Sequence, residues 1–171
     1  MIETERLILR PNILADFDAL HALNSHPEAM RYIGTGQPAT REDSWIRLLR
    51  NAGHWSLMGY GLFAVTLRET GTYIGHTGLA DFHRGLGDDF DPYPEAGWAF
   101  MPAFHGKGYA LEATQAALGR LQAERAPSRT VCIIDHENVP SLRLADKLGY
   151  RRYGEAQYKG RTAVKLERHA R

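Results

Sequence analysis

The amino-acid sequence predicts an α/β protein with a single mixed, mostly antiparallel central sheet flanked by helices on both faces. Three observations support this prediction. Apolar β-rich runs fill the middle and the end of the chain, amphipathic stretches lie between them, and a strand–helix–strand step occupies residues 95–135. Such a step places its two strands parallel in one sheet. The expected order is β-α-α-β-β-β-α-β-α-β-β, in one domain over residues 1–171.

The N-terminal part of the chain contains one predicted strand and two predicted helices. Glu5–Arg10 alternates around Leu7 and Leu9, which is typical of a half-buried strand. Apolar residues at helical spacing predict helices over about Leu14–Asn24 and Arg41–Leu57. Glycine and proline in residues 34–38 break the chain between these two helices.

The middle of the chain is rich in strand-forming residues. Three apolar runs predict strands over Gly61–Leu67, Tyr73–Asp81 and Glu95–Phe100. The turn Glu69-Thr70-Gly71 separates the first two and has the length of a hairpin connection. The third strand follows a loop over His83–Pro94 that holds several aspartates and prolines.

The second half begins with a long helix and ends with a hairpin. Alanine and leucine line one face of a helix predicted over about Gly108–Glu124, whereas its other face is polar. A strand and a short helix follow, and Gly149 is expected to end that helix in the left-handed conformation. The remaining predicted bounds are Arg129–Asp135 (strand), Val139–Leu148 (helix), and Tyr150–Tyr158 and Arg161–Glu167 (hairpin strands).

Composition and charge limit the classes of function. Lys and Arg number 21 against 20 Asp and Glu, and this balance argues against non-specific nucleic-acid binding. The chain contains no apolar run of membrane-spanning length, and its charged start does not resemble a signal peptide. We therefore expect a cytoplasmic protein without a membrane or nucleic-acid partner. Cys132, the single cysteine, lies in an apolar run and is expected to be a buried thiol.

The clearest chemical signal lies between a strand and the long helix, in residues 101–110 (MPAFHGKGYA). Gly106 and Gly108 allow the backbone to approach a ligand closely and to adopt positive φ. The first amides of the following helix lack intrahelical acceptors, so together with the helix dipole they favour an anion such as phosphate. Lys107 adds a positive charge if it faces the ligand. A glycine-rich turn without a ligand is the alternative.

Two common nucleotide motifs do not fit this stretch. A P-loop has its lysine after the second glycine, whereas Lys107 precedes Gly108. The dinucleotide pattern requires a third glycine where Leu111 stands. The sequence therefore disfavours an ordinary nucleotide as the ligand.

A second motif, Asn138–Tyr150 (NVPSLRLADKLGY), directly follows a predicted strand. Together with the glycine-rich stretch it resembles the GCN5-related N-acetyltransferase (GNAT) superfamily, and specifically its RimJ/RimL-like branch of ribosomal-protein N-acetyltransferases. Residues 3–11 (ETERLILRP), 74–78 (IGHTG) and 95–98 (EAGW) are similar to strands of that branch. The resemblance covers essentially the whole chain. It implies the GNAT acyl-CoA N-acyltransferase fold and transfer of acetyl from acetyl-CoA to a primary amine.

The resemblance also implies which residues hold the CoA pyrophosphate. Backbone amides around Gly108 would bind it, so the side chains matter less than the backbone. The family has Arg or Gln where His105 stands, which leaves the role of that side chain open. The residues expected to bind in this stretch are His105, Gly106, Lys107, Gly108, Tyr109 and Ala110.

The pantetheine arm would lie along the strand that contains Trp98 and Phe100. By resemblance, this strand would separate from its neighbour at a bulge near Phe100 and pair its backbone with pantetheine. Trp98 and Tyr109 are expected to pack beside the ligand and not to catalyse. Asn138 would contact the arm, cap the helix that follows it, or do both.

Direct transfer to a bound amine needs a proton acceptor and an oxyanion donor. A backbone amide near Phe100 is the expected oxyanion donor. Glu95 is the expected base, acting through water, and it needs burial to raise the pKa of its carboxylate. The alternative for Glu95 is a solvated strand-end residue or a clamp for the substrate.

The departing thiolate needs a proton donor. Many relatives have a tyrosine for this task where Ala145 stands in this chain. In the RimJ/RimL-like branch Ser141 would donate instead, or would hydrogen-bond the CoA sulfur. The alternative is a helix N3 serine that satisfies a backbone amide.

The expected acceptor is a protein N-terminal α-amine or a small-molecule amine. An α-amine with a pKa of about 7.7–8.0 is neutral far more often at pH 7 than a lysine with a pKa of about 10.4, so it suits one modest base. The acidic loop over His83–Glu95 would attract a cationic amine if it lies near the acetyl group; a solvated loop is the alternative. Oligomeric state, including a homodimer, stays open.

No metal is expected, because the histidines show no ligand spacing. A second class of function is a non-catalytic acyl-CoA-binding or sensory module of the same fold. Ala145 favours this class, whereas Glu95 and Ser141 favour the enzyme.

Overall fold

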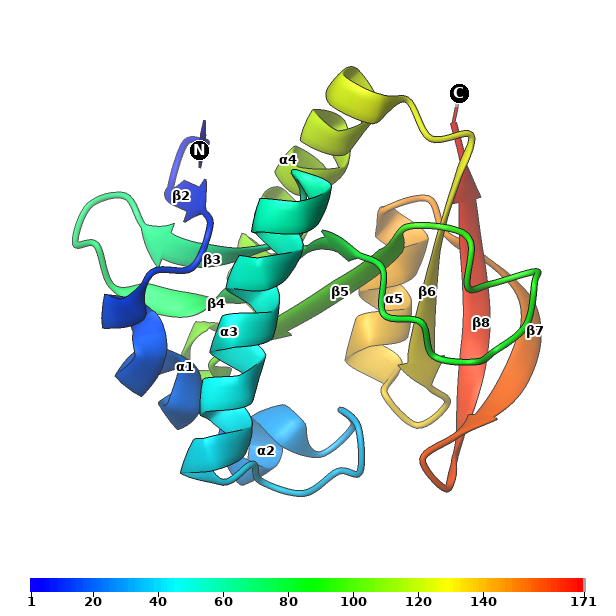
Figure 1. Ribbon diagram of the computed structural model, residues 1–171, viewed down its shortest axis with the longest axis horizontal. Coiled ribbons are helices and arrows are strands. Elements are labelled where there is room, and N and C mark those ends of the chain that lie inside the picture. Colours follow the sequence, from blue (N-terminus) through cyan, green and yellow to red (C-terminus); the bar gives the residue numbers. More distant parts are fainter. Residues whose placement is uncertain (171) are drawn as a thin grey trace.

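The computed structural model describes residues 1–170 and contains one eight-stranded sheet with the order β1-β2-β3-β4-β5-β6-β8-β7 (Figure 1). Neighbouring strands are antiparallel except β5 and β6, which are parallel as the strand–helix–strand step predicts. The bounds are β1 Ile2–Glu3, β2 Leu7–Arg10, β3 Leu62–Leu67, β4 Tyr73–Ala80, β5 Glu95–Phe100, β6 Arg129–Asp135, β7 Arg151–Tyr158 and β8 Arg161–His169.

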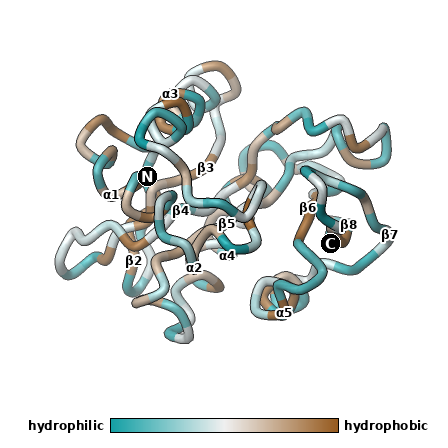
Figure 2. Tube along the Cα trace, turned by 90° about the horizontal axis from the view of Figure 1, so that it is seen from below, coloured by the Kyte–Doolittle hydropathy of each residue, from teal (hydrophilic) through white to brown (hydrophobic). Residues whose placement is uncertain are grey.

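Helices cover both faces of the sheet, as predicted: α1 and α3 lie on one face, and α4 and α5 lie on the other (Figure 2). Their bounds are α1 Phe17–Asn24, α2 Pro27–Met30, α3 Arg41–Met58, α4 Tyr109–Arg125 and α5 Val139–Lys147, with short 3-10 turns at Leu14–Asp16 and Pro102–Phe104. None of the helices in residues 1–170 is long and apolar enough to cross a membrane.

Local signals explain where the long helix α3 begins and ends. Thr40 accepts a hydrogen bond from the Asp43 backbone N–H, and Asp43 accepts one from the Thr40 backbone N–H, which together form a capping box. Gly59 ends the helix in the left-handed conformation, with φ of +72°. The helix therefore keeps nearly the length that the sequence predicts.

The core consists of two clusters that meet at Trp98. One cluster packs α4 against β2–β5, and the other packs α4 and α5 against β6 and β8. Trp98 is partly buried against both clusters. Cys132 is fully buried, as predicted, and burial raises the pKa of its thiol well above the ordinary value.

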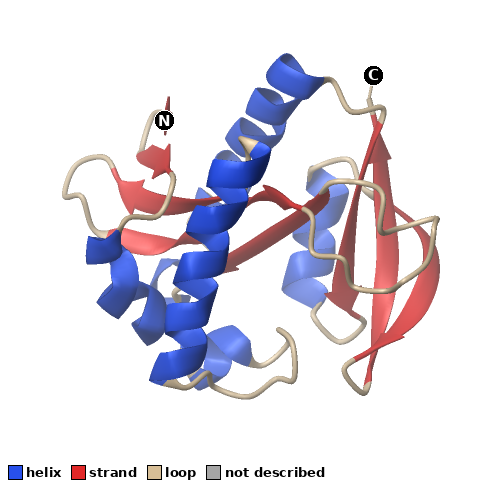
Figure 3. Cartoon of the chain, in the orientation of Figure 1, coloured by secondary structure: helices blue, strands red, loops and turns tan. Residues whose placement is uncertain are grey.

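Strands β5 and β6 pair at a single position and then separate. Glu95 is opposite Val131, and the Val131 N–H donates to the Pro94 carbonyl (3.1 Å). Beyond this point β5 continues beside β4, while β6 turns toward the β7–β8 hairpin (Figures 1 and 3). The predicted separation of the two strands is therefore present.

Three sequence predictions need correction. The structure contains β1 and α2, which the sequence did not predict, because four-residue and shorter elements carry too little periodicity to stand out. The bulge expected near Phe100 is wrong: the register between β4 and β5 runs unbroken from Ala80–Glu95 to Gly75–Phe100. The strands separate because β6 diverges, without an extra residue in β5.

Candidate active site

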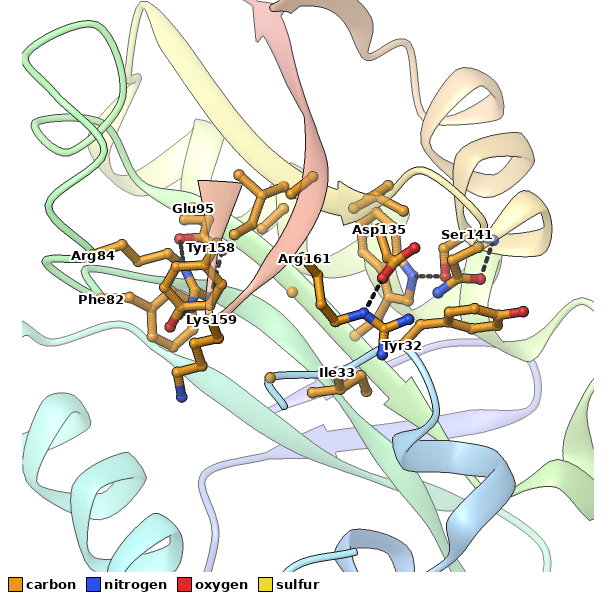
Figure 4. A pocket seen from close by; sticks show the side chains of 18 of the residues that line it. Tyr32, Ile33, Phe82, Arg84, Glu95, Asp135, Ser141, Tyr158, Lys159 and Arg161 are labelled. Carbon is orange, nitrogen blue, oxygen red and sulfur yellow. Dashed lines mark hydrogen bonds and ion pairs between the residues drawn. The ribbon is translucent and has the colours of Figure 1, made fainter. Parts of the chain in front are cut away.

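A cleft of about 220 Å³ opens where β5 and β6 separate. Four of the predicted site residues line it together: Glu95 and Trp98 from β5, and Asn138 and Ser141 from the start of α5. Figure 4 shows Glu95 and Ser141 on opposite sides of this cleft. The cleft therefore joins the strand and the helix that carry the two predicted catalytic side chains.

The backbone of β5 presents an open edge to the cleft. The Met101 N–H donates to the Ile74 carbonyl (2.9 Å), and the Gly97 carbonyl accepts from Thr77 Oγ1 (3.1 Å). The backbone N–H and C=O groups of the odd-numbered residues of β5 therefore point toward β4. Backbone groups alternate in direction along a strand, so those of Trp98 and Phe100 face away from β4. Because β6 has diverged, no strand in residues 1–170 pairs with this edge beyond Glu95.

Ser141 belongs to a small hydrogen-bonded group at the N-terminus of α5. Its Oγ accepts a hydrogen bond from Trp98 Nε1 (3.2 Å), and its backbone N–H donates to Asn138 Oδ1 (3.2 Å). The Ser141 hydroxyl proton is thus left to point at another acceptor. Asn138 caps the helix, which is one of its two expected roles. Sequence reasoning missed the contact from Trp98, because 43 residues separate it from Ser141.

Glu95 is buried and bound on both oxygens. Arg84 donates from Nε to Glu95 Oε2 (2.6 Å) and from Nη2 to Oε1 (2.7 Å). The same guanidinium donates from Nη1 to the Tyr158 hydroxyl (2.7 Å). Burial raises the pKa of the Glu95 carboxyl, and Arg84 opposes this rise. Glu95 is therefore not the solvated strand-end residue that was one alternative.

The cleft is markedly cationic, although the whole chain has a net charge of only +1. Five cationic side chains and two carboxylates line it, and the carboxylates of Glu95 and Asp135 are each bound to an arginine, Arg84 and Arg161 respectively. The remaining cations are Arg47, Arg50 and Lys159. Sequence reasoning missed these residues, because nothing local indicates which face of α3 meets the cleft.

The aspartates of the acidic loop before β5 lie outside the cleft. Asp89 binds Lys165 (2.5 Å), Asp91 accepts from the Leu86 N–H (2.9 Å), and neither lines the cleft, nor does Asp88. The loop instead contributes Arg84, which adds positive charge. Of the two readings of this loop, the structure therefore favours the one without a role in attracting a cationic amine.

His76 also lines the cleft and is partly buried beside Tyr73, whose hydroxyl lies 3.4 Å from His76 Nδ1. Burial, together with the charges of Arg47 and Arg50, lowers the pKa of His76 to about 4. The imidazole is consequently neutral near pH 7 and adds no charge to the cleft.

Phe100 ends β5 with its side chain buried in the core, so its side chain does not line the cleft. The remaining predicted residues, His105–Ala110, form the N-terminal entrance to α4, and we call them the cradle. Gly106 and Gly108 have φ of +73° and +83°, so both need the freedom of glycine. A Cβ at Gly106 would meet no atom within 4 Å, and one at Gly108 would lie 3.4 Å from Arg6 Nη2. Gly108 is the N-cap of α4 without a side-chain cap, so the first helix amides stay available to an anion.

The side chains of His105 and Lys107, whose roles the sequence left open, both contact the protein itself. His105 Nε2 donates to the Phe100 carbonyl (2.8 Å), so His105 ties the cradle to the end of β5. Lys107 Nζ lies over the Phe104 ring, 5.5 Å from its centre. Arg6, which the sequence analysis did not include, donates to the Lys107 carbonyl (3.0 Å) and pairs with Glu112 (2.6 Å). The cradle thus has one further cation beside it.

Comparison with known proteins gives a consistent result. Residues 6–151 match the family model of the acetyltransferase (GNAT) domain. The chain is 35% identical over 153 residues to the uncharacterised N-acetyltransferase YnaD of Bacillus subtilis, covering 90% of this chain and 84% of that protein.

Solved structures agree with this match. A Bordetella pertussis protein described as a GnaT-family acetyltransferase has a TM-score of 0.87 at 34% identity, with 98% of each chain covered. RimL, a ribosomal L7/L12 α-N-protein acetyltransferase solved with coenzyme A, has a TM-score of 0.79 at 16% identity, with 97% of this chain and 95% of that chain covered. At that identity the RimL structure shows a common fold.

Proposed function

This chain belongs to the GNAT acetyltransferases, in their RimJ/RimL-type branch, and is an N-acetyltransferase; we propose that it transfers acetyl from acetyl-CoA, bound between the cradle and the open edge of β5, to an amine that enters the cleft. The observation that carries this proposal is the separation of β5 from β6. It exposes strand backbone beside the cradle and places Glu95 and Ser141 in one cleft.

The residues present fit CoA. The amides at the start of α4 and the positive-φ glycines suit a pyrophosphate, because a side chain at either glycine would be strained and would crowd the anion. The outward N–H of Trp98 suits an amide oxygen of pantetheine, in the manner of a peptide that extends a sheet. When bound, CoA supplies the activated acetyl group as a thioester.

On the acceptor side, we assign proton removal to Glu95, acting through water. Burial favours the neutral carboxylic acid, so this carboxylate is a stronger base than an exposed one, although its pair with Arg84 limits the gain. The positive charge around the cleft disfavours an ammonium ion and so favours the neutral, nucleophilic amine. The Phe100 N–H on the open edge would donate to the acetyl oxygen as negative charge develops there.

On the CoA side, we assign the proton donor to Ser141. Its Oγ accepts from Trp98 Nε1, and accepting a hydrogen bond at oxygen makes a hydroxyl a better donor. Trp98 is thus a positioning residue for Ser141. The position used by a tyrosine in many relatives is Ala145, which is fully buried in the core, so Ser141 is the hydroxyl available from α5.

A thiol-release assay tests the proposal. Acetyl-CoA would be offered with amino acids, peptides with free N-termini, polyamines and aminoglycosides, and CoA release would be followed with each. We expect release that depends on one class of amine. Acetyl-CoA binding without release on any amine would contradict this proposal and favour a sensory role. A cytoplasmic location and a single domain over residues 1–171 stay predictions.

A further inference from the structure

Helix α3 presents arginines to the cleft and apolar side chains to solvent. Ile46 and Leu49 are 56% and 52% exposed, whereas Arg47 and Arg50 line the cleft. The same helix packs Leu48 into the core with 3% exposure, so its inward side is ordinary and the two arginines are an addition to it. An arginine pair directed at a cleft therefore calls for an explanation other than packing.

Neither arginine has a carboxylate partner. Arg47 donates from Nη1 to Asn24 Oδ1 (3.2 Å), and Arg50 lies over the Phe82 ring, 5.5 Å from its centre. Within residues 1–170 no carboxylate oxygen lies within 4.0 Å of either guanidinium. Burial lowers the pKa of Arg47, and the charge of Asp43, which forms no ion pair with Arg47, opposes this shift.

The two carboxylates of the cleft are not available to a cationic ligand. Glu95 is bound by Arg84 on both oxygens, and Asp135 is bound by Arg161 (2.5 Å). Lys159 adds a further cation, with Nζ over the Tyr158 ring. The electrostatics of the cleft consequently favour an anion and oppose a polycation.

We propose that the acceptor is a small amine that also carries a carboxylate, such as a free amino acid, and that Arg47 and Arg50 bind this carboxylate; the inference rests on the proposed acetyl transfer. Residues three apart on a helix lie on one face, so both guanidinium groups reach the same region. The planar fork of arginine matches a carboxylate in a bidentate manner. A cleft of about 220 Å³ suits a ligand of amino-acid size better than a larger one.

This assignment explains how one cleft both binds and activates its amine. The carboxylate anchors the acceptor on α3, while the surrounding cations disfavour protonation of the amine. A neutral amine or a polyamine would meet the same cations without an anchor. The acceptor's own negative charge therefore decides whether it enters the cleft.

The experiment compares L-α-amino acids with their carboxamides, spermidine and a peptide with an acidic N-terminus, using CoA release by the full chain. Loss of the carboxylate makes an amine less basic and more often neutral, so basicity alone would favour the carboxamides. We expect the opposite preference in kcat/KM, because only the free amino acids offer the anchor. A better rate with carboxamides, with spermidine or with the acidic peptide would overturn the inference and leave acetyl transfer intact.

Substitutions locate the anchor. Arg47→Gln and Arg50→Gln should each lower kcat/KM for amino acids by about 10- to 100-fold, the size expected for a charge-assisted hydrogen bond, through KM more than kcat. KM for acetyl-CoA should change little. The loss with carboxamides should be much smaller than the loss with amino acids, because carboxamides lose only the effect of the cations on the protonation of the amine. Arg41→Gln is the matched control: it lies on α3, pairs with Asp18 and does not line the cleft. Equal losses on amino acids and carboxamides would overturn the assignment.

If no amine releases CoA, the proposed transfer fails, and calorimetry then decides the carboxylate site by itself. Amino acids would be titrated into the chain in the presence of CoA. Binding that disappears in the Arg47→Gln/Arg50→Gln double variant supports the site. Absence of binding to the unaltered chain overturns it. Thermal melting curves of the variants show whether they are folded.

Discussion

The cradle is the proposed site of CoA and the cleft is the proposed site of the acceptor. The two differ in the groups that form them. The cradle is mostly backbone: two glycines with positive φ and the free amides of a helix start, all within six consecutive residues. The cleft is lined by residues from many separate segments, among them α3, β4, the loop before β5, β5 itself, β6, α5 and the β7–β8 hairpin. A site made of local backbone leaves a local sequence pattern, whereas a site made of distant side chains does not.

The same difference appears in the charges. The cradle offers neutral amides and a helix dipole, and its neighbour Arg6 is already paired with Glu112. The cleft offers full charges, three of them without a carboxylate partner among the described residues. Changes in the cradle should therefore act on CoA binding through shape, while changes in the cleft should act on the acceptor and on catalysis.

The largest expected effect tests the cradle. Gly108→Glu places a bulky anion at φ of +83°, where a Cβ already lies 3.4 Å from Arg6, and should weaken CoA binding by about 100-fold or more. Calorimetry with CoA measures it. Gly119→Glu is the matched control, because it makes the same change at an open, exposed position of α4. If Gly108→Glu bound CoA with unchanged affinity, the assignment of the CoA pyrophosphate to the cradle would be wrong.

The next effect tests the cleft through Glu95. Glu95→Gln keeps the shape, removes the base and leaves Arg84 unpaired, and should lower kcat by about 100-fold with little change in KM for acetyl-CoA. Glu124→Gln serves as an exposed control.

A double variant separates the two roles of Glu95. If it only compensates Arg84, Arg84→Gln/Glu95→Gln should recover most of the activity that the single variant loses. If it is the base, the double variant should stay inactive. Recovery of activity would therefore contradict the role of Glu95 as the base and would favour its alternative role, a clamp for the substrate.

A smaller effect tests the CoA side of the cleft. Ser141→Ala should lower kcat by about 10- to 100-fold and leave the affinity for CoA nearly unchanged, because in our proposal the cradle and the edge of β5 bind CoA. Steady-state kinetics and calorimetry measure the two quantities separately. Ser56→Ala, on the exposed side of α3, is the control. Equal losses in kcat and affinity would make Ser141 a binding residue only.

The smallest effect tests whether Trp98 positions Ser141. Trp98→Phe keeps an aromatic ring in the core but removes Nε1, and should lower kcat by about 2- to 10-fold, the value of one neutral hydrogen bond. The combination with Ser141→Ala should cost no more than Ser141→Ala alone. Trp55→Phe removes an indole hydrogen bond to the Leu62 carbonyl outside this group and controls for loss of stability. If the losses in kcat from the two substitutions were additive, Trp98 would act independently of Ser141.

The sequence predicted most of the fold because its signals are local. The bounds of β5 and β6 are those that the apolar runs indicate, and Gly149 ends α5 with φ of +88° as expected. The backbone geometry of the cradle was also predicted, because its two glycines and the helix start are contiguous; its binding of pyrophosphate stays a prediction. The elements missed, β1 and α2, are two and four residues long.

Much of the cleft could not be predicted, because it depends on packing between distant segments. Helical spacing shows that Arg47 and Arg50 share a face of α3, but not that this face meets the cleft while Leu49 meets solvent. The bidentate pair of Arg84 with Glu95 depends on the path of the loop between them. The predicted bulge failed for a similar reason, since the divergence belongs to β6 and not to β5.

The single pairing of β5 with β6 has a consequence for how such a protein can diverge during evolution. In the proposed reaction it separates the two reactants: CoA binds backbone beside α4, and the acceptor binds side chains around Arg47 and Arg50. Substitutions at the acceptor site leave the CoA site intact, so an evolving protein can exchange one amine for another and still bind the same acyl donor. Related proteins that act on different amines would then keep Gly106 and Gly108 but differ at Arg47 and Arg50.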